Sequence, residues 1–474
     1  MQRTFGLLFA TIVLTSSTAS VAERRSAFTS CLEKGGPSDT VLTPSSPGYD
    51  ASRNATTNKR LSYLPAAIAF PSKSQDVQKY VKCAAAYGVA VVGRSGGHSY
   101  ASYGVGGQDG SLVIDLSKLK SISFDGQGNV KVQTGNRLGD IAQALWDNGQ
   151  RALPHGTCPY VGSGGHAAFG GFGPFSRVAG LLHDHITAAE VVLADGTLTT
   201  VSVKKNPDLF WALRGAGASY GIVTQWTFAT LPVPPSVVSY KISYDVMKAP
   251  QVKDQLVKWQ DIALSAPDNL SFRGTYYGLQ AEFDALSSNW TTVLGPGVLT
   301  SQANNWYDGL VAISGPLATN GTEAQQNFFT KSLFTKSALT AAQWDSLFAY
   351  IGNEGAIAPV DWYIEIDRWG GGVAKQASDA TSFAQRDALL SFQMYGGLLS
   401  VDNPYPAEGV PFVNGILNSI DPNPQAAYSN YVDPTLTPAQ WKLQYYGSHY
   451  PRLAAIKRTV DPKNVFRFPQ SIGL

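Results

Sequence analysis

The sequence has few charged residues, few cysteines and few methionines, and these shortages narrow what the protein can be. Only 15% of its 474 residues are charged, and 36 basic residues nearly balance 34 acidic ones, for a net charge of +2. Because there is no basic run, the charge pattern weighs against nucleic acid or an anionic membrane as a partner. Beyond the N-terminus, no apolar stretch approaches the ~20 residues of a bilayer span, so we expect no transmembrane segment.

Glycine and aromatic residues are abundant instead. The chain contains 47 glycines, 22 tyrosines, 21 phenylalanines and 10 tryptophans, and 44% of its residues are hydrophobic. A chain of this length and apolar content can bury a large core, and we expect it to divide into two or three lobes. With only 3 methionines beside so many aromatic rings, the composition indicates a β-rich enzyme with aromatic-lined clefts.

Residues 1–22 have the pattern of a secretory signal. Arg3 precedes an apolar core, residues 5–14, and Ser20-Val21-Ala22 supplies the small residues of a cleavage site. We therefore expect a secreted, extracellular protein whose mature chain begins near Glu23. Four N-glycosylation sequons agree with this compartment; they lie at Asn54, Asn269, Asn289 and Asn320.

The three cysteines cannot all be paired within one chain. Cys31 lies near the expected mature N-terminus, where a tether is useful, and Cys83 lies on a predicted helix, so we expect these two to form a disulfide. Cys158 is then free. An isolated cysteine is usually a buried, unreactive thiol, but the glycine-rich turn beside Cys158 favours a functional role.

Periodicity and turn residues predict alternating strands and helices. We expect a βαβ unit whose helix has Ser74 as its N-cap, and a β-hairpin around Asp195-Gly196. Strands are predicted at residues 65–70, 88–92, 111–115, 130–134, 186–193, 198–202, 222–229, 271–277, 309–313, 362–367 and 389–395. Helices are predicted at residues 74–87, 138–147, 207–213, 251–265, 324–329, 341–350 and 453–458. The proline-rich residues 231–235 are the best domain boundary.

The glycine-rich stretch from residue 91 to 173 is the part around which the chain is organised. It opens with Gly93-Arg94-Ser95-Gly96-Gly97-His98-Ser99-Tyr100, directly after a hydrophobic strand. Such small residues leave backbone N–H groups exposed, and a concave nest of these groups suits an anion such as a pyrophosphate. His98 directly follows the first glycine turn, and Cys158 precedes the second glycine-rich run.

Three other patterns suggest different chemistry. Gly93-Arg94-Ser95-Gly96-Gly97 matches the nucleophile elbow of serine hydrolases, but the residues after Ser95 lack the helical period that an elbow requires. Gly215, Gly217 and Gly221 resemble a dinucleotide fingerprint, yet they follow a helix and precede a strand, the reverse of the Rossmann order. His183 and His185 could share a strand face, but no neighbouring residues have metal-ligand spacing, so we expect no metal site.

The acidic strand at residues 361–367 could bind a polyhydroxyl compound. Its odd-numbered residues, Asp361, Tyr363, Glu365 and Asp367, lie on one face, and its large apolar residues lie on the other. This face is either solvated or a wall where carboxylates accept sugar hydroxyls and an aromatic ring stacks on a pyranose. The phenols of residues 445–450 either pack in a core or, if a neighbour lowers the pKa of one of them, supply a base.

Several runs recur together in one known family. They are Arg94 to Ser99, Gly156-Thr157-Cys158, residues 162–173, Trp211-Ala212-Leu213-Arg214-Gly215-Ala216-Gly217, Asp461-Pro462-Lys463-Asn464-Val465-Phe466 and Pro469-Gln470-Ser471-Ile472. In this order, from about residue 60 to the C-terminus, the chain resembles the berberine-bridge-enzyme-like flavoproteins of the vanillyl-alcohol-oxidase superfamily. Within that family it is most similar to the fungal secreted gluco-oligosaccharide and chito-oligosaccharide oxidases.

The resemblance implies an α+β fold of two lobes. An FAD-binding lobe of two α+β subdomains would comprise residues 61–233 and the returning segment 431–474. A substrate lobe, residues 234–430, would carry an antiparallel sheet backed by helices, while residues 23–60 form an N-terminal surface segment. The sugar would lie between the lobes, over the isoalloxazine ring.

The resemblance also assigns roles to individual residues. FAD would be attached through two covalent bonds, an 8α-histidyl bond from His98 and a 6-S-cysteinyl bond from Cys158. Tyr445 with Asp367 would activate the substrate hydroxyl. The sugar site would comprise Tyr100, Tyr363, Glu365 and Gln393. The remaining cofactor contacts would be Arg94, Ser95, Gly96, Gly97, Ser99, Gly162, Gly164, Gly165, Gly170, Gly171, Ile186, Gly217, Gly221, Ile222 and Gln470.

Two residues depart from the family pattern. Glu365 stands where the gluco-oligosaccharide enzymes have glutamine, and His449 stands where asparagine is common. The first departure leaves the preferred sugar open.

The implied reaction is oxidation of an oligosaccharide at its anomeric C1 hydroxyl by a monomeric enzyme, with O2 reduced to hydrogen peroxide. Oxidases of other alcohols and secondary-metabolite cyclases have the same fold. A serine hydrolase using Ser95 and a non-catalytic carbohydrate-binding protein are the alternatives from other classes.

Overall fold

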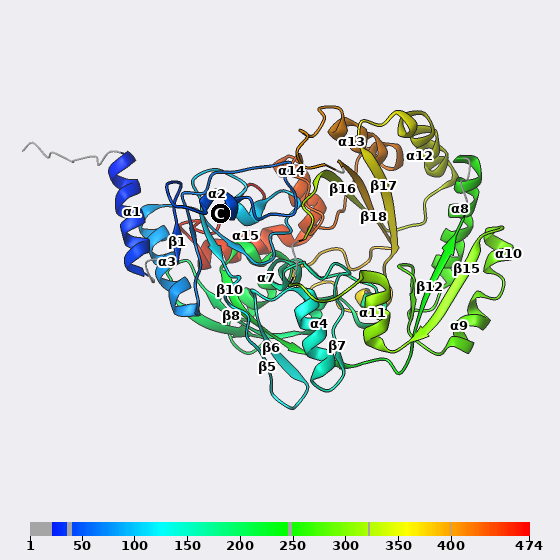
Figure 1. Ribbon diagram of the computed structural model, residues 1–474, viewed down its shortest axis with the longest axis horizontal. Helices are drawn as coiled ribbons and strands as arrows, with labels where there is room; N and C mark the ends of the chain where they lie inside the picture. The colour runs from blue at the N-terminus through cyan, green and yellow to red at the C-terminus, as the bar shows by residue number, and fades with distance from the viewer. Residues whose placement is uncertain (1–20, 36–39, 245–248, 321–322, 399) are drawn as a thin grey trace, which may run out of the picture.

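The structure, a computed structural model, describes residues 21–35, 40–244, 249–320, 323–398 and 400–474. In the described part of the chain, one mainly parallel sheet and four antiparallel sheets lie among helices, which confirms the expected α+β class. Residues 1–20 of the expected signal lie outside the described residues. Figure 1 shows an elongated molecule with the N-terminal elements at one end and β12, β15 and α8 to α10 at the other.

A small sheet holds the strand that leads into the glycine-rich stretch. Its order is β1 (Val41–Leu42), β2 (Ala67–Ala69), β4 (Leu112–Asp115) and β3 (Val91–Arg94), with β2, β4 and β3 parallel. Helix α3 (Ser74–Tyr87) connects β2 to β3, so the βαβ prediction is confirmed. The predicted cap is wrong. Lys73 is the N-cap, and the Ser74 hydroxyl instead donates to Glu190 of the neighbouring sheet at 2.6 Å.

The N-terminal surface segment contains a helix that its turn-rich composition concealed. Helix α1 (Val21–Gly35) packs on α3 through the buried side chains of Phe28 and Leu32, and a short helix α2 (Tyr49–Arg53) follows. The predicted disulfide between Cys31 and Cys83 joins α1 to α3, and Cys158 is free. Both cysteine predictions are therefore confirmed.

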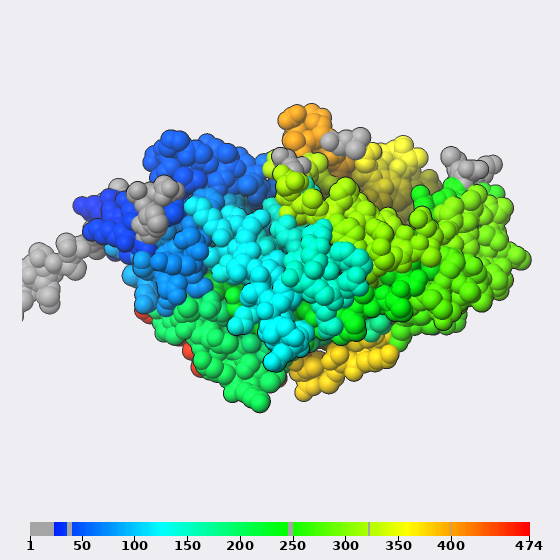
Figure 2. Space-filling view, turned by 60° about the horizontal axis from the view of Figure 1, so that its bottom comes forward, coloured from blue at the N-terminus to red at the C-terminus, as the bar shows by residue number. Residues whose placement is uncertain are grey.

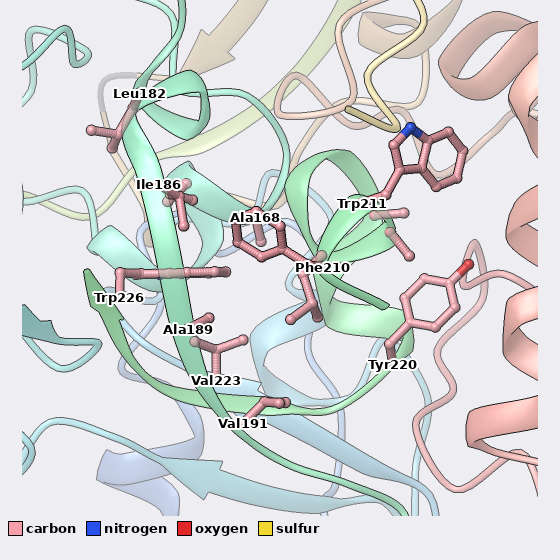
Figure 3. Close-up of a cluster of buried hydrophobic side chains, with 14 of the residues drawn as sticks. Ala168, Leu182, Ile186, Ala189, Val191, Phe210, Trp211, Tyr220, Val223 and Trp226 are labelled. Carbon is pink, nitrogen blue, oxygen red and sulfur yellow. The ribbon is translucent and has the colours of Figure 1, made fainter. Parts of the chain in front are cut away.

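The second sheet is antiparallel and forms the centre of the largest core. Its order is β5 (Ile122–Phe124), β6 (Asn129–Gln133), β10 (Ile222–Ala229), β8 (Ile186–Val192) and β9 (Leu198–Ser202), and β8 and β9 form the expected hairpin. Helix α7 (Pro207–Ala216) packs on this sheet. Figure 3 shows the aromatic rings of Phe210 and Trp226 among Ala168, Ile186 and Ala189, all of them buried.

The central part of the chain forms two further antiparallel sheets. One has the order β13 (Leu270–Ser271), β14 (Thr275–Tyr276), β12 (Val237–Ser243) and β15 (Val298–Asn304). The other has the order β16 (Asn327–Thr335), β18 (Leu390–Leu398) and β17 (Asp361–Arg368). Helices α12 (Ala341–Glu354) and α13 (Gly409–Ile420) cover the apolar face of the β16–β18–β17 sheet (Figure 1). Its other face is left for the site described below.

Two predicted elements of this part are wrong. Residues 309–313 belong to helix α11 (Trp306–Ser314), where Asn305 accepts a hydrogen bond from the Asp308 amide as N-cap and Trp306, Gly309 and Leu310 form the buried stripe. Residues 327–329 of the predicted helix 324–329 begin strand β16. This strand is buried on both faces, so it lacks the alternation by which a strand is recognised in a sequence.

The remaining helices and short strands are distributed over the molecule. They are α4 (Leu138–Asp147), β7 (Arg151–Ala152), α5 (Ser163–Ala168), α6 (Ser176–Ala179), β11 (Leu231–Pro232), α8 (Ala249–Ser265), α9 (Gln280–Ser287), α10 (Trp290–Leu294), α14 (Pro438–Trp441) and α15 (Tyr450–Val460). Helices α4 and α11 meet where the Tyr307 hydroxyl donates to Gln143 at 2.7 Å. The cyan and yellow-green surfaces of these regions adjoin in the space-filling view (Figure 2). None of the described helices combines the length and apolar character needed to cross a membrane.

The C-terminal segment returns to the N-terminal lobe, where a buried lysine joins it to the loop after α7. Helix α15 lies beside α7, and the fully buried Lys457 ammonium donates to Asp461 at 2.7 Å and to the carbonyls of Ser219 and Phe466. Asp461 also accepts from the amides of Val465 and Phe466. This network fixes the Asp-Pro-Lys-Asn-Val-Phe run noted in the sequence.

We expect Asp461→Asn to destabilise the protein by about 3–5 kcal/mol, because it leaves the Lys457 ammonium buried without a counter-charge. Urea unfolding followed by tryptophan fluorescence measures the loss. The matched control is Asp208→Asn in the exposed Arg452–Asp208 pair, which should cost less than about 1 kcal/mol. Equal losses in the two variants would contradict a role for the buried pair.

Candidate active site

A cavity of about 460 Å³ lies between the glycine-rich stretch and the polar face of the β16–β18–β17 sheet, a volume in the usual range for small-molecule sites. One wall comprises residues 92–100 with parts of 156–166. The opposite wall comprises the polar face of the sheet, and residues 428–432 with Tyr445 and Gln470 close the inner end. Segments far apart in the sequence therefore share one chamber.

Two glycine turns form the floor of this cavity by touching each other. A Cβ atom at Gly96 would lie 2.3 Å from the Gly162 amide nitrogen, and one at Gly162 would lie 2.1 Å from the Gly96 nitrogen, so only glycine fits at either position. No described residue accepts a hydrogen bond from the amides of residues 96–99. These amides form the expected nest for an anion.

His98, Cys158 and Glu323 meet beside this nest. His98 Nε2 lies 2.7 Å from Glu323 Oε2, and the Cys158 thiol donates to Glu323 Oε1 at 3.5 Å. Burial and the adjacent Glu323 charge raise the pKa of the Cys158 thiol. Burial alone would raise the pKa of Glu323, but hydrogen bonds and the charge of His98 lower it. The two expected attachment residues thus flank one carboxylate.

Polar atoms without a partner on the cavity wall suit a flavin dinucleotide. The hydroxyl of Tyr103 and Oε1 of Gln470, both on its wall, are buried and have no hydrogen-bond partner among the described residues. Together with the free amides of residues 96–99, they need a ligand that has an anionic part and polar edges. The cavity therefore fits FAD. His98, Cys158, the amide nest, Tyr103 and Gln470 are the residues that would hold it.

The polar face of β17 and β18 forms a wall with rings at its outer end and amide and carboxyl groups further in. In the strand register Tyr363 lies opposite Tyr395 and Glu365 lies opposite Gln393. The two tyrosine rings are stacked, with centroids 4.7 Å apart, and Tyr363 is 46% exposed. The Gln393 amide donates to the Tyr100 hydroxyl at 2.9 Å. All four predicted sugar-site residues therefore line one cavity.

Arg273, from the turn between β13 and β14, organises the acidic residues of β17. Its guanidinium donates to both oxygens of Asp367, at 2.8 and 2.6 Å, and contacts Glu365 directly. It also donates to the Tyr431 hydroxyl at 3.3 Å. The pKa of Glu365 is raised to about 7, because burial and the charge of Asp367 together outweigh the lowering effect of Arg273. Asp367 is buried behind Arg273 and does not line the cavity.

The predicted pairing of Tyr445 with Asp367 is wrong. The Tyr445 oxygen accepts a hydrogen bond from the Asp433 amide at 2.9 Å, and no described contact joins it to Asp367. The phenol next to Arg273 is Tyr431, whose ring stacks on Tyr100. Burial raises the pKa of both phenols, but the positive charge of Arg273 opposes the rise at Tyr431 alone. Both tyrosines line the cavity, so the order of motifs along the chain does not tell which of them lies beside Arg273.

Several predicted cofactor residues support the cavity without lining it. Arg94, Ser95, Gly96, Gly97, Ser99, Gly162, Gly165 and Gln470 line it, whereas Gly164, Gly170, Gly171, Ile186, Gly217, Gly221 and Ile222 do not. Ile186 and Ile222 are buried in hydrophobic cores, and a Cβ atom at Gly221 would lie 2.5 Å from Val191. These residues set the packing behind the wall.

The alternative motifs have structural roles. The Ser95 hydroxyl donates to the Thr134 carbonyl and accepts from the Gly164 amide, and no described histidine contacts it, so the hydrolase interpretation is wrong. His183 contacts Arg386, and His185 contacts the Ala179 carbonyl. His449 packs on Trp211 outside the cavity.

The sequence did not predict that Glu323, Arg273 and Tyr431 belong to the site. Tyr431 belongs to a Tyr-Ser-Asn-Tyr run, residues 428–431, whose clustered polar and aromatic residues were a usable signal. Glu323 and Arg273 carry no local pattern, because each reaches the site only through contacts with residues 92 or more positions away in the chain.

Known proteins match the chain over most of its length. A family model described as "FAD binding domain" matches residues 65–202, and one described as "Berberine and berberine like" matches residues 427–473. A xylooligosaccharide oxidase of Thermothelomyces thermophilus is 37% identical over 88% of both chains. A chitooligosaccharide oxidase of Gibberella zeae is 34% identical over 97% of both chains. The structure of the glucooligosaccharide oxidase from Acremonium strictum, with its 6-S-cysteinyl, 8α-N1-histidyl FAD, superposes with a TM-score of 0.87 at 32% identity, covering 94% of this chain and 99% of its own.

We expect the stability of the protein to fall as pH rises from about 4.5 to 7, in part because of Glu365. Its folded-state pKa is raised, so over this interval the folded state holds a proton that the unfolded state has released. Glu365→Gln should lack this contribution, so its free energy of unfolding, measured in urea at pH 5 and 7.5, should fall less than that of the wild type. Glu408→Gln, at an exposed carboxyl, should keep the wild-type slope. An unchanged slope in Glu365→Gln would contradict the assignment.

Proposed function

Because this chain belongs to the berberine-bridge-enzyme-like FAD-linked oxidoreductases, we propose that it oxidises the anomeric C1 hydroxyl of an oligosaccharide to the lactone and reduces O2 to hydrogen peroxide. One observation carries the proposal: a single cavity joins His98 and Cys158 to a wall of stacked tyrosines and hydrogen-bonding side chains. The substrate class is that of the relatives, which act on xylo-, chito- and glucooligosaccharides by their names.

The flavin is proposed to be attached by two covalent bonds, to His98 and to Cys158. The support is their common position at the cavity floor and the doubly attached FAD of the Acremonium strictum enzyme. When bound, the flavin accepts a hydride and passes two electrons to O2. A cofactor tied at two points does not depend on enclosure to stay bound, which suits a cavity that must admit a chain of sugars.

The sugar is proposed to lie along the wall formed by β17 and β18. The exposed ring of Tyr363, stacked on Tyr395, offers an apolar surface for a pyranose, as aromatic rings do in many ligand sites. Further in, Glu365 and Gln393 can accept and donate hydrogen bonds to ring hydroxyls. This arrangement would determine which end of the sugar reaches the cavity floor. Holding the reacting group in the right orientation accounts for a large part of an enzyme's rate enhancement.

Tyr431 is proposed as the base that takes the proton from the substrate hydroxyl, in place of Tyr445. Its oxygen lies 3.3 Å from Arg273, whose positive charge favours the phenolate, and Arg273 is held in turn by Asp367. Asp367 then positions the cation and does not touch the substrate. Tyr445 keeps the main chain at Asp433 in place.

The protein is further proposed to be a secreted, glycosylated monomer. The support is the signal pattern of residues 1–22 and the Cys31–Cys83 disulfide, since disulfides persist in oxidising compartments. Among the sequons, Asn289 and Asn320 are exposed, whereas the Asn269 amide donates to the Tyr277 carbonyl. Asn289 and Asn320 are therefore the sites most open to a glycan. The division into residues 61–233 with 431–474, and 234–430, likewise stays a proposal.

A panel of cello-, xylo-, malto- and chito-oligosaccharides, assayed for peroxide, tests the proposed reaction. We expect peroxide and the matching aldonic acid, detected by mass spectrometry, with at least one series, and we expect acid-precipitated protein to remain yellow. Tyr363→Ala should raise KM more than it lowers kcat, because the ring binds the sugar without taking part in proton transfer. Colourless native protein, or no peroxide with any sugar, would refute the proposal.

We expect Tyr431→Phe to lower kcat by about 10²–10⁴-fold, the usual contribution of a general base, while the flavin spectrum and substrate KM change little. Tyr445→Phe removes a hydroxyl from the same cavity and is the matched control, with an expected loss below tenfold. Anaerobic stopped-flow reduction of the flavin measures the step directly. If Tyr445→Phe were the slower variant, the original pairing would be right and Tyr431 would be only a packing residue.

A further inference from the structure

Glu323 is the one described carboxylate that contacts both flavin-attachment side chains. Its two oxygens are divided between them: Oε2 lies 2.7 Å from His98 Nε2, and Oε1 accepts from the Cys158 thiol at 3.5 Å. Thr57 donates a third hydrogen bond to Oε2 at 3.2 Å. The mechanism proposed for sugar oxidation does not use Glu323, although it lines the cavity.

Each attachment must release a proton from the side chain that forms the new bond. At His98 an N–C bond forms to the flavin 8α-methyl carbon, and at Cys158 an S–C bond forms to the ring carbon C6. Each bond replaces one hydrogen on the protein and one on the flavin, both released as protons. The two remaining electrons reduce the flavin and then pass to O2, which leaves as hydrogen peroxide. A base near both side chains would serve both reactions.

The position of the carboxylate also selects the reacting nitrogen of His98. Because a carboxylate only accepts, the 2.7 Å contact favours the imidazole tautomer that has its hydrogen on Nε2 and a free electron pair on Nδ1, although the Nε2–H bond is not aligned with the carboxylate here. When Nδ1 forms its bond the ring becomes cationic, and the Nε2 proton can then pass directly to Glu323. At Cys158 the same carboxylate can take the S–H proton and so generate the thiolate, which is the reactive form.

Other titratable groups around the floor are poorly placed for this task. His166 is half-buried, accepts a hydrogen bond from the Gly156 amide at 3.0 Å, and has a pKa that desolvation lowers to about 3. Glu365 and Asp367 are held by Arg273. The lowered pKa of Glu323 keeps it ionised and able to accept a proton, and the raised pKa of Cys158 means that its thiol needs a base.

We propose that Glu323 is the proton acceptor for covalent attachment of the flavin at both His98 and Cys158. This inference rests on the proposed doubly attached FAD, but it concerns how the enzyme is completed and not how it oxidises sugar. It makes one carboxylate responsible for two bonds that lie on different segments of the chain.

The test compares full-length wild-type protein and Glu323→Gln, each produced under riboflavin limitation and then given FAD in air. Samples taken over time are acid-precipitated, the flavin in the pellet is quantified, and peptides containing His98 or Cys158 are identified by mass. We expect Glu323→Gln to attach flavin at least tenfold more slowly at both residues, since general bases typically contribute 10²-fold or more. Formate should restore part of the rate in Glu323→Ala.

Two variants of equal side-chain length separate the effect of a basic carboxylate from the effect of side-chain shape. Glu323→Asp and Glu323→Asn shorten the side chain equally and differ only in the carboxylate, so the aspartate variant should attach flavin at least tenfold faster than the asparagine variant. This comparison still decides the question if Glu323→Gln binds FAD poorly. Equal rates in that pair, or a wild-type rate in Glu323→Gln, would overturn the inference. If the wild-type protein itself attached no flavin, the proposed cofactor linkage would fail instead.

Discussion

The contact between the glycine turns at Gly96 and Gly162 is the constraint on which the rest of the site depends. The two backbones approach so closely that a Cβ atom on either glycine would overlap the other chain. This approach brings His98 and Cys158, sixty positions apart in the sequence, to the two sides of Glu323. A larger residue at either glycine would separate the turns, and the amide nest and both attachment points would separate with them.

The charged groups at the floor and at the wall of this cavity serve different purposes. At the floor, one carboxylate faces an imidazole and a thiol, a set that can exchange protons but holds no permanent cation. At the wall, Arg273 compensates Asp367 and Glu365 and leaves the Tyr431 hydroxyl beside a positive charge. Buried charges of this kind are tolerated only where they are paired and hydrogen-bonded, which explains why the acidic strand β17 needs an arginine from another sheet.

Predictions that depend on neighbours close in the sequence were confirmed, whereas those that depend on distant contacts often failed. The β8–β9 hairpin, helix α4 and the face pattern of β17 depend on neighbours within a few residues, and all were confirmed. Strand β16 was mistaken for a helix because both of its faces are buried, which removes the alternation that identifies a strand. The prediction that Ser74 caps α3 failed because its hydroxyl donates to Glu190 of strand β8, and a local sequence pattern does not reveal such a distant partner.

The sequence by itself determined the class of the protein, the free cysteine and the residues expected to hold the cofactor. The free cysteine follows from cysteine parity, and the class and the cofactor residues follow from the resemblance of several ordered motifs to a known family; all of these are properties of the chain read along its length. Only the tertiary structure decided which phenol lies beside Arg273, which carboxylate joins His98 to Cys158, and which glycines line the cavity. Each of these depends on distances between segments far apart in the chain, and such distances are set when the lobes pack and the C-terminal segment returns.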